Sequence, residues 1–159
     1  MNLEVANNRE LTKVEAIMWS IALPGFAQLL TGNLIKGVFF VGLEILVNVM
    51  GSFNKAIMYS FLGETKRAME VIDYQWLMFY PCLYMFVMWD AYRSAMPDTE
   101  KLSFLPFAFS AYFVTLGLMY SPIVKILGLF PGPVFLPMLF VIPGLLSGYI
   151  IRKILLRFL

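Results

Sequence analysis

The stretch LIKGVFFVGLEILVNVMGSF, residues 34–53, decides the structural class of this chain. It has the length of about 20 residues that a helix needs to cross a hydrocarbon core of about 30 Å. Only Lys36, Glu44 and Asn48 interrupt its apolar character. Four more apolar blocks lie around it, at residues 14–30, 76–95, 104–121 and 134–151. The sequence therefore predicts an all-α integral membrane bundle of four to five transmembrane helices.

The composition of the chain agrees with a single membrane domain over residues 1–159. Hydrophobic residues make up 60% of the sequence, and the mean hydropathy is +0.78. A net charge of +2 gives no reason to expect nucleic-acid binding. Histidine is absent and Cys82 is the only cysteine, so imidazole chemistry, disulfides and thiolate metal sites within one chain are excluded. We expect neither a metal nor a cofactor.

The domain divides into four segments along the chain. Residues 1–13 form a polar tail, and residues 14–53 form a broken helix followed by the first full span. In residues 54–75, apolar side chains recur at helical spacing with charges between them, which predicts an amphipathic interfacial connection of two short helices broken at Gly63. Residues 76–159 supply three further spans.

The first apolar block, residues 14–30, is broken at Pro24-Gly25 and allows two arrangements. If it crosses the membrane with a kink, the twelve basic residues divide six against six between the two faces. If it is re-entrant, they divide eight against four, and the positive-inside rule then places both termini in the cytoplasm. We favour the re-entrant arrangement with four spans.

Glu44 is the leading candidate for a functional residue. It lies near the middle of its block, and Asn48 follows one helical turn later on the same face. An intramembrane carboxylate costs at least about 2.5 kcal/mol to insert unless it is protonated, paired or hydrated. Glu44 either lines a polar cavity for a cation or proton, or bonds to Asn48, Gln28 or a helix backbone and fixes packing.

Two further groups of residues are candidates for structural roles. In Trp89-Asp90-Ala91-Tyr92-Arg93, we expect Asp90 to pair with Arg93 at the membrane surface, with Trp89 and Tyr92 as interfacial anchors. Gly144 and Gly148 form a GxxxG motif, which marks either a dimer face or a seat for another helix of the same chain. Pro137 and Pro143 are expected to kink this last helix.

The stretch 23–37 resembles the first hairpin of the TM2-like proteins, which are small bacterial membrane proteins with the pattern L-P-G-x-G-Q-x-x-x-G-x-x-x-K-G. The matching residues are Leu23, Pro24, Gly25, Gln28, Gly32, Lys36 and Gly37. The chain departs from the pattern at Ala27, where the family usually has glycine, and Trp89-Asp90-Ala91-Tyr92 is similar to the end of a later helix of that family. The resemblance implies a multi-pass protein of the bacterial cytoplasmic membrane, with the Lys36 turn near the cytoplasmic face. It implies no particular activity.

Motifs of catalysis are not found in the sequence: it has no Gly-rich phosphate loop, no serine paired to a base and no cluster of carboxylates with a phosphate clamp. We therefore expect a non-enzymatic accessory or scaffold subunit, whose partners are membrane lipid and either another membrane protein or a second copy of itself. The alternative is a small oligomeric ion channel or transporter that uses Glu44 and Asn48.

Overall fold

The computed structural model describes residues 10–96 and 100–159, and within these ranges the only regular elements are α-helices. The helices are α1 Lys13–Ala22, α2 Phe26–Leu30, α3 Leu34–Met50, α4 Phe53–Phe61, α5 Thr65–Val71, α6 Tyr74–Leu77, α7 Tyr80–Ser94, α8 Leu105–Tyr120 and α9 Gly132–Leu155. The fold is therefore all-α, as the sequence predicts.

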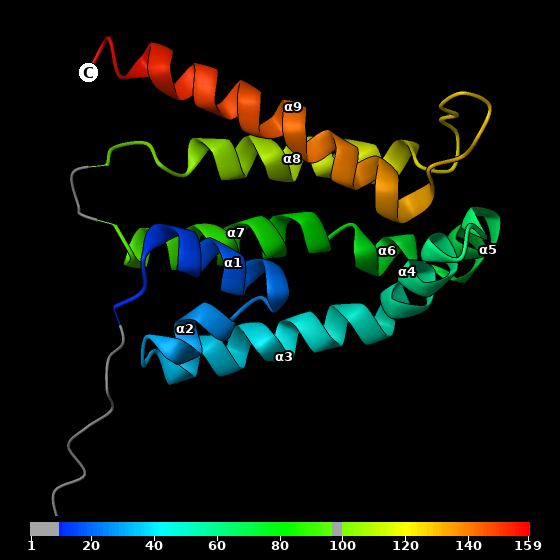
Figure 1. Cartoon of the computed structure of the whole chain (residues 1–159), viewed down its shortest axis with the longest axis horizontal. Coiled ribbons are helices and arrows are strands. Elements are labelled where there is room, and N and C mark those ends of the chain that lie inside the picture. The colour runs from blue at the N-terminus through cyan, green and yellow to red at the C-terminus, as the bar shows by residue number, and fades with distance from the viewer. Residues whose placement is uncertain (1–9, 97–99) are drawn as a thin grey trace, which may run out of the picture.

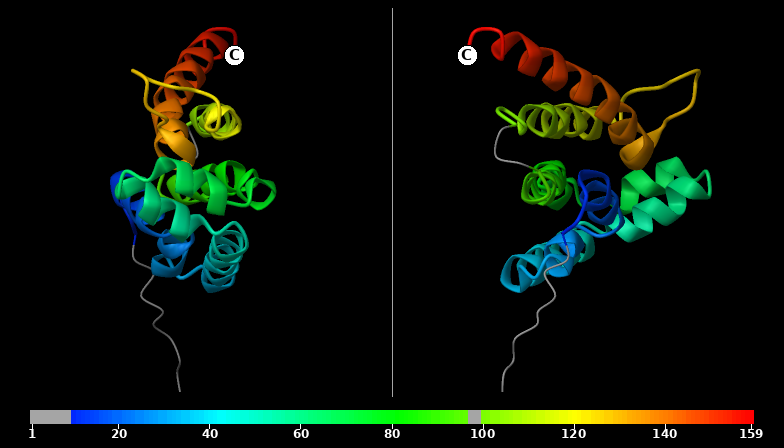
Figure 2. Two further views of the ribbon diagram at one scale, coloured as in Figure 1. Left: turned by 90° about the vertical axis from the view of Figure 1, so that its right-hand side faces the viewer. Right: turned by 60° about the vertical axis from the view of Figure 1, so that its left-hand side comes forward.

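The long helices lie side by side, and α7 is in the middle of the molecule (Figure 1). One side of α7 packs against α8, which in turn packs along α9. The other side contacts α1, and the contacts continue from α1 to α2 and from α2 to α3. The shorter helices α4 and α5 lie together at one end of this bundle, as Figure 2 also shows. We call this the α4–α5 end, and we call the opposite end, which holds the C-terminus, the C-terminal end.

Helices α1 and α2 form a hairpin that turns inside the bundle. Leu23, which precedes a proline, is extended and ends α1, because the proline ring disfavours helical backbone at the residue before it. The side chain of Tyr84, in the middle of α7, donates to the carbonyl of Ile21 at 3.1 Å, whereas Lys13 at the start of α1 reaches Glu100 beyond the end of α7. The hairpin therefore enters from the C-terminal end and, by way of α2, returns to it (Figure 1).

The third apolar block contains a break that follows from Pro81. Helix α6 ends at Leu77, four residues before this proline, and α7 begins at Tyr80. Proline lacks the N–H that would bond to the carbonyl four residues earlier, and its ring clashes with that carbonyl. Inside α9, by contrast, the helix continues without a break through both Pro137 and Pro143.

The connection 54–75 is largely helical. Helices α4 and α5 flank Gly63, which has a φ of 78°, so the two-helix arrangement agrees with the periodicity of the sequence. The short helix α6 begins just before the end of this connection, with Asp73 as its N-cap. The buried residues Ala56, Ala68, Leu77 and Leu118 join α4, α5, α6 and α8 into one apolar cluster.

Helix α9 lies against the backbone of α8 along a seam of small residues. A Cβ atom added at Gly144 would lie 2.6 Å from the Cα of Ser110, and one added at Gly148 would lie 2.5 Å from the Cα of Pro106. On the α8 side, Gly117 faces the Cα of Pro137 in the same way, at 2.9 Å. The GxxxG motif thus packs against α8 of the same chain. This is one of the two alternatives that the sequence left open.

By length and composition, the described residues contain one clear candidate for a membrane span. This is α9, with 24 residues and a mean hydropathy of 2.1. A second candidate arises if α3 and α4, which meet at a bend of 67°, are counted together as one broken span. Helix α8 is apolar but has only 16 residues, and α7 has 15. The sequence blocks were long enough for four or five spans, but turns and proline breaks shorten the helices within them.

Candidate functional site

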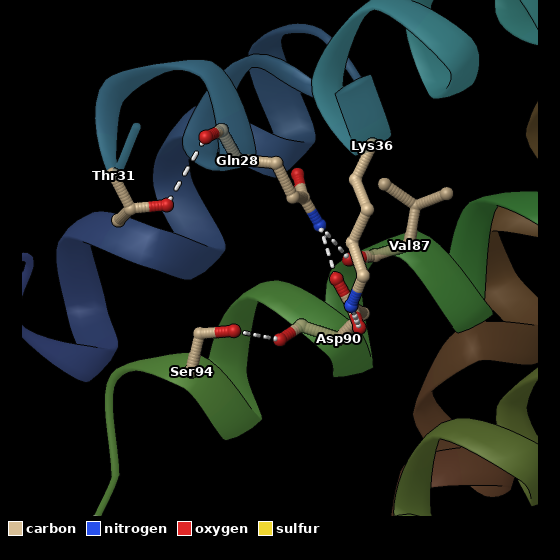
Figure 3. A network of polar contacts seen from close by, with 6 residues as sticks. All are labelled: Gln28, Thr31, Lys36, Val87, Asp90 and Ser94. Carbon is tan, nitrogen blue, oxygen red and sulfur yellow. Dashed lines mark hydrogen bonds and ion pairs between the residues drawn. The ribbon is translucent and has the colours of Figure 1, made fainter. Parts of the chain in front are cut away.

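The polar residues of the two sequence motifs meet at one place, where the hairpin lies against the last turns of α7 (Figure 3). The side-chain amide of Gln28 donates to Oδ2 of Asp90 at 3.1 Å and to the carbonyl of Val87 at 3.0 Å. The ammonium of Lys36 donates to the other carboxylate oxygen of Asp90 at 3.0 Å. Gln28 is only 1% exposed. This Gln28–Asp90–Lys36 network therefore joins α2, α3 and α7 through a single carboxylate.

The glycines of the hairpin motif make this network possible. Gly25 has a φ of 97°, and a Cβ added there would lie 2.8 Å from the carbonyl oxygen of Gly37 and 2.9 Å from the backbone nitrogen of Val41. A side chain on Gly37 would in turn collide with Leu29. Close contact of α2 with α3 therefore needs glycine on both sides, and it brings Gln28 and Lys36 to the same face of α7. Gly32, with a φ of 82°, lies in the turn between α2 and α3, and Pro24 is buried in the hairpin turn.

The expected pair between Asp90 and Arg93 is wrong. Asp90 binds Lys36 and Gln28 across the helix contact, while the guanidinium of Arg93 lies over the ring of Trp89, 5.7 Å from its centroid. The spacing of three residues allowed a local pair, but the hairpin brings a cation and an amide to the buried side of the helix. The ring nitrogen of Trp89 donates to the hydroxyl of Ser103 at 3.4 Å.

A second polar cluster closes the C-terminal end of the bundle around Glu100. Its carboxylate accepts from the ammonium of Lys13 and from the hydroxyl of Tyr92, the latter at 3.0 Å, and lies 3.6 Å from the guanidinium of Arg152. The hydrogen bond from Lys13 lowers the pKa of Glu100 below its usual value. We call this cluster the Glu100 pin. It ties the start of α1 and the ends of α7 and α9 to the connection that precedes α8.

Glu44 is buried in the middle of α3, with 7% of its surface exposed. One carboxylate oxygen accepts from the hydroxyl of Tyr80 at 3.0 Å, and the other is buried without a hydrogen-bond partner among the described residues. The ring of Tyr80 lies between the rings of Phe53 and Tyr84, at centroid distances of 4.9 and 5.4 Å. Glu44 thus lies in an aromatic environment with one hydroxyl partner and one free acceptor.

Asn48 does not share the environment of Glu44. Its side chain exchanges hydrogen bonds with Asn54, accepting from the backbone N–H at 3.2 Å and donating to the side-chain oxygen at 3.3 Å. It therefore supports the bend between α3 and α4. The expectations that Asn48 acts together with Glu44, or that Glu44 bonds to Gln28, do not match these contacts.

Two hollows lie next to each other, one between α7 and α8 and the other between the end of α7 and the connection that leads to α8. The first is an open apolar groove of about 390 Å³, with Met85, Phe86 and Trp89 on one wall and Phe104, Phe107 and Ala111 on the other. The second, of about 190 Å³, is lined by Arg93, Glu100, Lys101, Ser103 and Phe104, among others. In the part of the chain that the structure describes, no group of three or more acidic, cysteine or histidine side chains could hold a metal ion.

Several of these partnerships could not be found by reading the sequence. Glu100 lies in a polar connection, where a charged residue carries no signal. Tyr80 is one of eight tyrosines and stands at the start of an apolar block. Only the pairing of the hairpin motif with Asp90 had a signal, because both belong to the pattern of the TM2-like resemblance.

No protein-family model matches this chain, and comparisons with curated proteins and with solved structures find no match either. The TM2-like resemblance therefore stays a prediction based on the residues of the hairpin and of the α7 end.

Proposed function

We propose that this chain is a multi-pass membrane protein with four spans, namely α3, the pair α6 and α7, α8, and α9, and with α1 and α2 as a re-entrant hairpin. The hairpin reaches from the level of Tyr92 to that of Tyr84 along α7, a depth of about 12 Å at 1.5 Å per residue. That is less than half of a hydrocarbon core of about 30 Å. A re-entrant backbone needs shielding by protein, and α7 and α3 supply it.

The distribution of basic residues supports this topology. Seven basic residues of the described chain belong to the C-terminal end, which are Lys13, Lys36, Arg93, Lys101, Arg152, Lys153 and Arg157. Four belong to the α4–α5 end, which are Lys55, Lys66, Arg67 and Lys125. The positive-inside rule assigns the richer end to the cytoplasm, which agrees with the cytoplasmic membrane location that the resemblance implies.

The exposed side chains of the helices also support membrane insertion. Large apolar residues cover the outer faces of α3 and α9, and several are more than half exposed, among them Ile35 at 88%, Val49 at 67% and Ile142 at 60%. Only 28% of the apolar window of α9 is buried inside the bundle. A core helix of a soluble protein would be mostly buried, and soluble proteins rarely expose wide apolar surfaces. Lipid or another membrane protein would cover these faces. The spans shorter than α9 would be matched by local thinning of the bilayer.

We infer further that the protein is a non-enzymatic accessory or scaffold subunit. This inference rests on the hydrogen bonds that polar side chains of the helices form with other residues of the same chain. Gln28, Asp90 and Asn48 all form hydrogen bonds within the chain, whereas many of the exposed side chains of α3 and α9 are large and apolar. Such a molecule offers a rigid apolar surface for another membrane protein or for lipid.

The test is native mass spectrometry of the tagged protein, extracted from its own membrane in mild detergent. A foreign subunit in fixed stoichiometry supports the accessory role. A lone chain or a closed homo-oligomer without a foreign subunit contradicts it. Gly148 is not a useful position for disrupting a partner contact, because a side chain there would break the packing of α8 and α9 inside the chain.

The second candidate function is a small channel or transporter, and the free carboxylate oxygen of Glu44 favours it. A buried acceptor without a partner is costly, and an ionisable side chain inside a membrane is by default a candidate for a proton or ion site. This function predicts that Glu44→Gln abolishes flux in proteoliposomes while the protein stays folded. Equal flux for wild type and Glu44→Gln, or no flux in either, would exclude it.

A further inference from the structure

We propose that the groove between α7 and α8 binds one acyl chain of an anionic phospholipid, and that the phosphate of this lipid binds between Arg93 and Lys101. The proposal rests on the membrane placement of the preceding section. It adds a ligand of defined chemistry and a site for it.

The groove has the character of an acyl-chain site. Along α7 its wall runs from Cys82 to Trp89, about 10 Å at 1.5 Å per residue. Its lining consists of aromatic rings, methionine, alanine and the one cysteine, and it is open to the surroundings rather than enclosed. Methionine and aromatic side chains adapt to a flexible apolar chain without imposing polar contacts.

The adjoining pocket has the character of a phosphate site. Arg93 and Lys101 are both exposed, and among the described residues neither forms an ion pair with a carboxylate. The third charged group of the pocket is Glu100, whose carboxylate is already neutralised by Lys13 and Arg152. The pocket therefore keeps a positive charge, and guanidinium and ammonium groups are the usual partners of phosphate.

The two hollows form one amphipathic site. Phe104 lines both of them, and Trp89 on the groove side donates to Ser103 on the pocket side at 3.4 Å. The guanidinium of Arg93 lies over the same tryptophan ring. An apolar groove that ends at two cations and an interfacial tryptophan matches an amphiphile with a negative head. A free phosphate would leave the groove empty, and an apolar helix of a partner would leave both cations without an anion.

The experiment titrates the detergent-solubilised full chain with phosphatidylglycerol, and with phosphatidylcholine of the same acyl chains, and counts bound lipids by native mass spectrometry. We expect one tightly bound phosphatidylglycerol and weaker binding of phosphatidylcholine. At about 1 kcal/mol per basic residue near the headgroup, Arg93→Gln combined with Lys101→Gln should weaken phosphatidylglycerol binding about 30-fold. The control pair Lys153→Gln and Arg157→Gln removes the same charge at the same end, outside the pocket, and should leave the affinity unchanged.

A second pair of variants tests the groove. Ala108→Phe places a ring in the groove, and Gly42→Phe places the same ring on α3, where no atom lies within 4 Å of an added Cβ. Only Ala108→Phe should reduce lipid binding, with both variants monodisperse in size-exclusion chromatography.

Three results would overturn the proposal. One is an equal loss of affinity in the two charge pairs. Another is equal affinity for the two lipids. The third is full competition by glycerol 3-phosphate alone, which would make the pocket a site for a soluble phosphate. Extraction of the chain from membranes by alkaline carbonate is a separate assay, and release there would contradict the membrane placement without altering these affinities.

Discussion

Replacing Gly148 with alanine would add one methyl group where α9 lies closest to the backbone of α8. The new Cβ would lie 2.5 Å from the Cα of Pro106 and 2.6 Å from the carbonyl oxygen of Leu105. Non-bonded carbon atoms normally approach to about 3.5–4.0 Å. Both neighbours are backbone atoms and cannot rotate away, so the two helices must separate by about 1 Å at this point.

The expected cost follows from this separation. Overpacking of a tightly packed site typically costs about 1–3 kcal/mol, and the higher helix propensity of alanine returns up to about 1 kcal/mol. We therefore expect Gly148→Ala to lower the free energy of unfolding by up to about 2 kcal/mol. Gly144→Ala acts on the same seam one turn earlier, so the double variant should cost less than the sum of the two single variants.

The assay is reversible unfolding in mixed micelles, in which the helix signal is followed as the fraction of denaturing detergent rises. The matched control is Gly42→Ala in α3, where an added Cβ meets open space. This variant should be neutral or stabilised by up to about 1 kcal/mol. If Gly148→Ala proves as stable as Gly42→Ala, the close packing of α8 on α9 is incorrect.

Three further predictions concern the polar contacts. Tyr80→Phe removes the one hydrogen bond of the buried Glu44 and should destabilise the protein by about 1–3 kcal/mol in the same unfolding assay, whereas no change would mean that the bond is not formed. A double-mutant cycle with Asp90→Asn and Lys36→Gln should give a coupling energy of about 0.5–1 kcal/mol, and strictly additive effects would contradict the ion pair. The partners of Glu100 lower its pKa in the folded protein. The stability from the Glu100 pin is therefore present above the unfolded pKa of about 4.3 and is lost as the pH falls through the lower folded value. Glu100→Gln should flatten the pH dependence of the free energy of unfolding in this acidic range, and an unchanged profile would refute the pin.

The class of the fold could be predicted from the sequence because hydropathy is a property of each segment alone. The same holds for the two short helices around Gly63 and for the break at Pro24, since both depend on local backbone preferences. Helix lengths were overestimated because the apolar blocks include turns. Pro81 divides one apolar block into α6 and α7. Helix α3 ends at Met50, before the end of its apolar block, because Gly51 caps it and Ser52 has a left-handed backbone conformation.

The contacts of the candidate site could not be derived from the sequence in the same way. Asp90 has a cation three residues later, and the local rule favours that pair, but tertiary packing brings Lys36 from more than fifty positions away. The neighbours of Glu44 show the same limitation, since helical spacing pointed to Asn48 and the structure supplies Tyr80. For close helix contact the sequence did give a signal at Gly144 and Gly148, because a GxxxG spacing is typical of helices that pack closely.

The most direct test of the account is the membrane sidedness of three single cysteines in a Cys82→Ala background, labelled with a membrane-impermeant maleimide. Asn33 lies in the turn after the hairpin, Phe158 lies at the C-terminus, and Leu127, which is 98% exposed, lies in the connection at the α4–α5 end. We predict that Asn33→Cys and Phe158→Cys react from one face and Leu127→Cys from the other. Reaction of Asn33→Cys or Phe158→Cys from the same face as Leu127→Cys would contradict the four-span topology, and reaction of a fourth single cysteine, Glu10→Cys before α1, from the face opposite to that of Asn33→Cys would contradict the re-entrant hairpin.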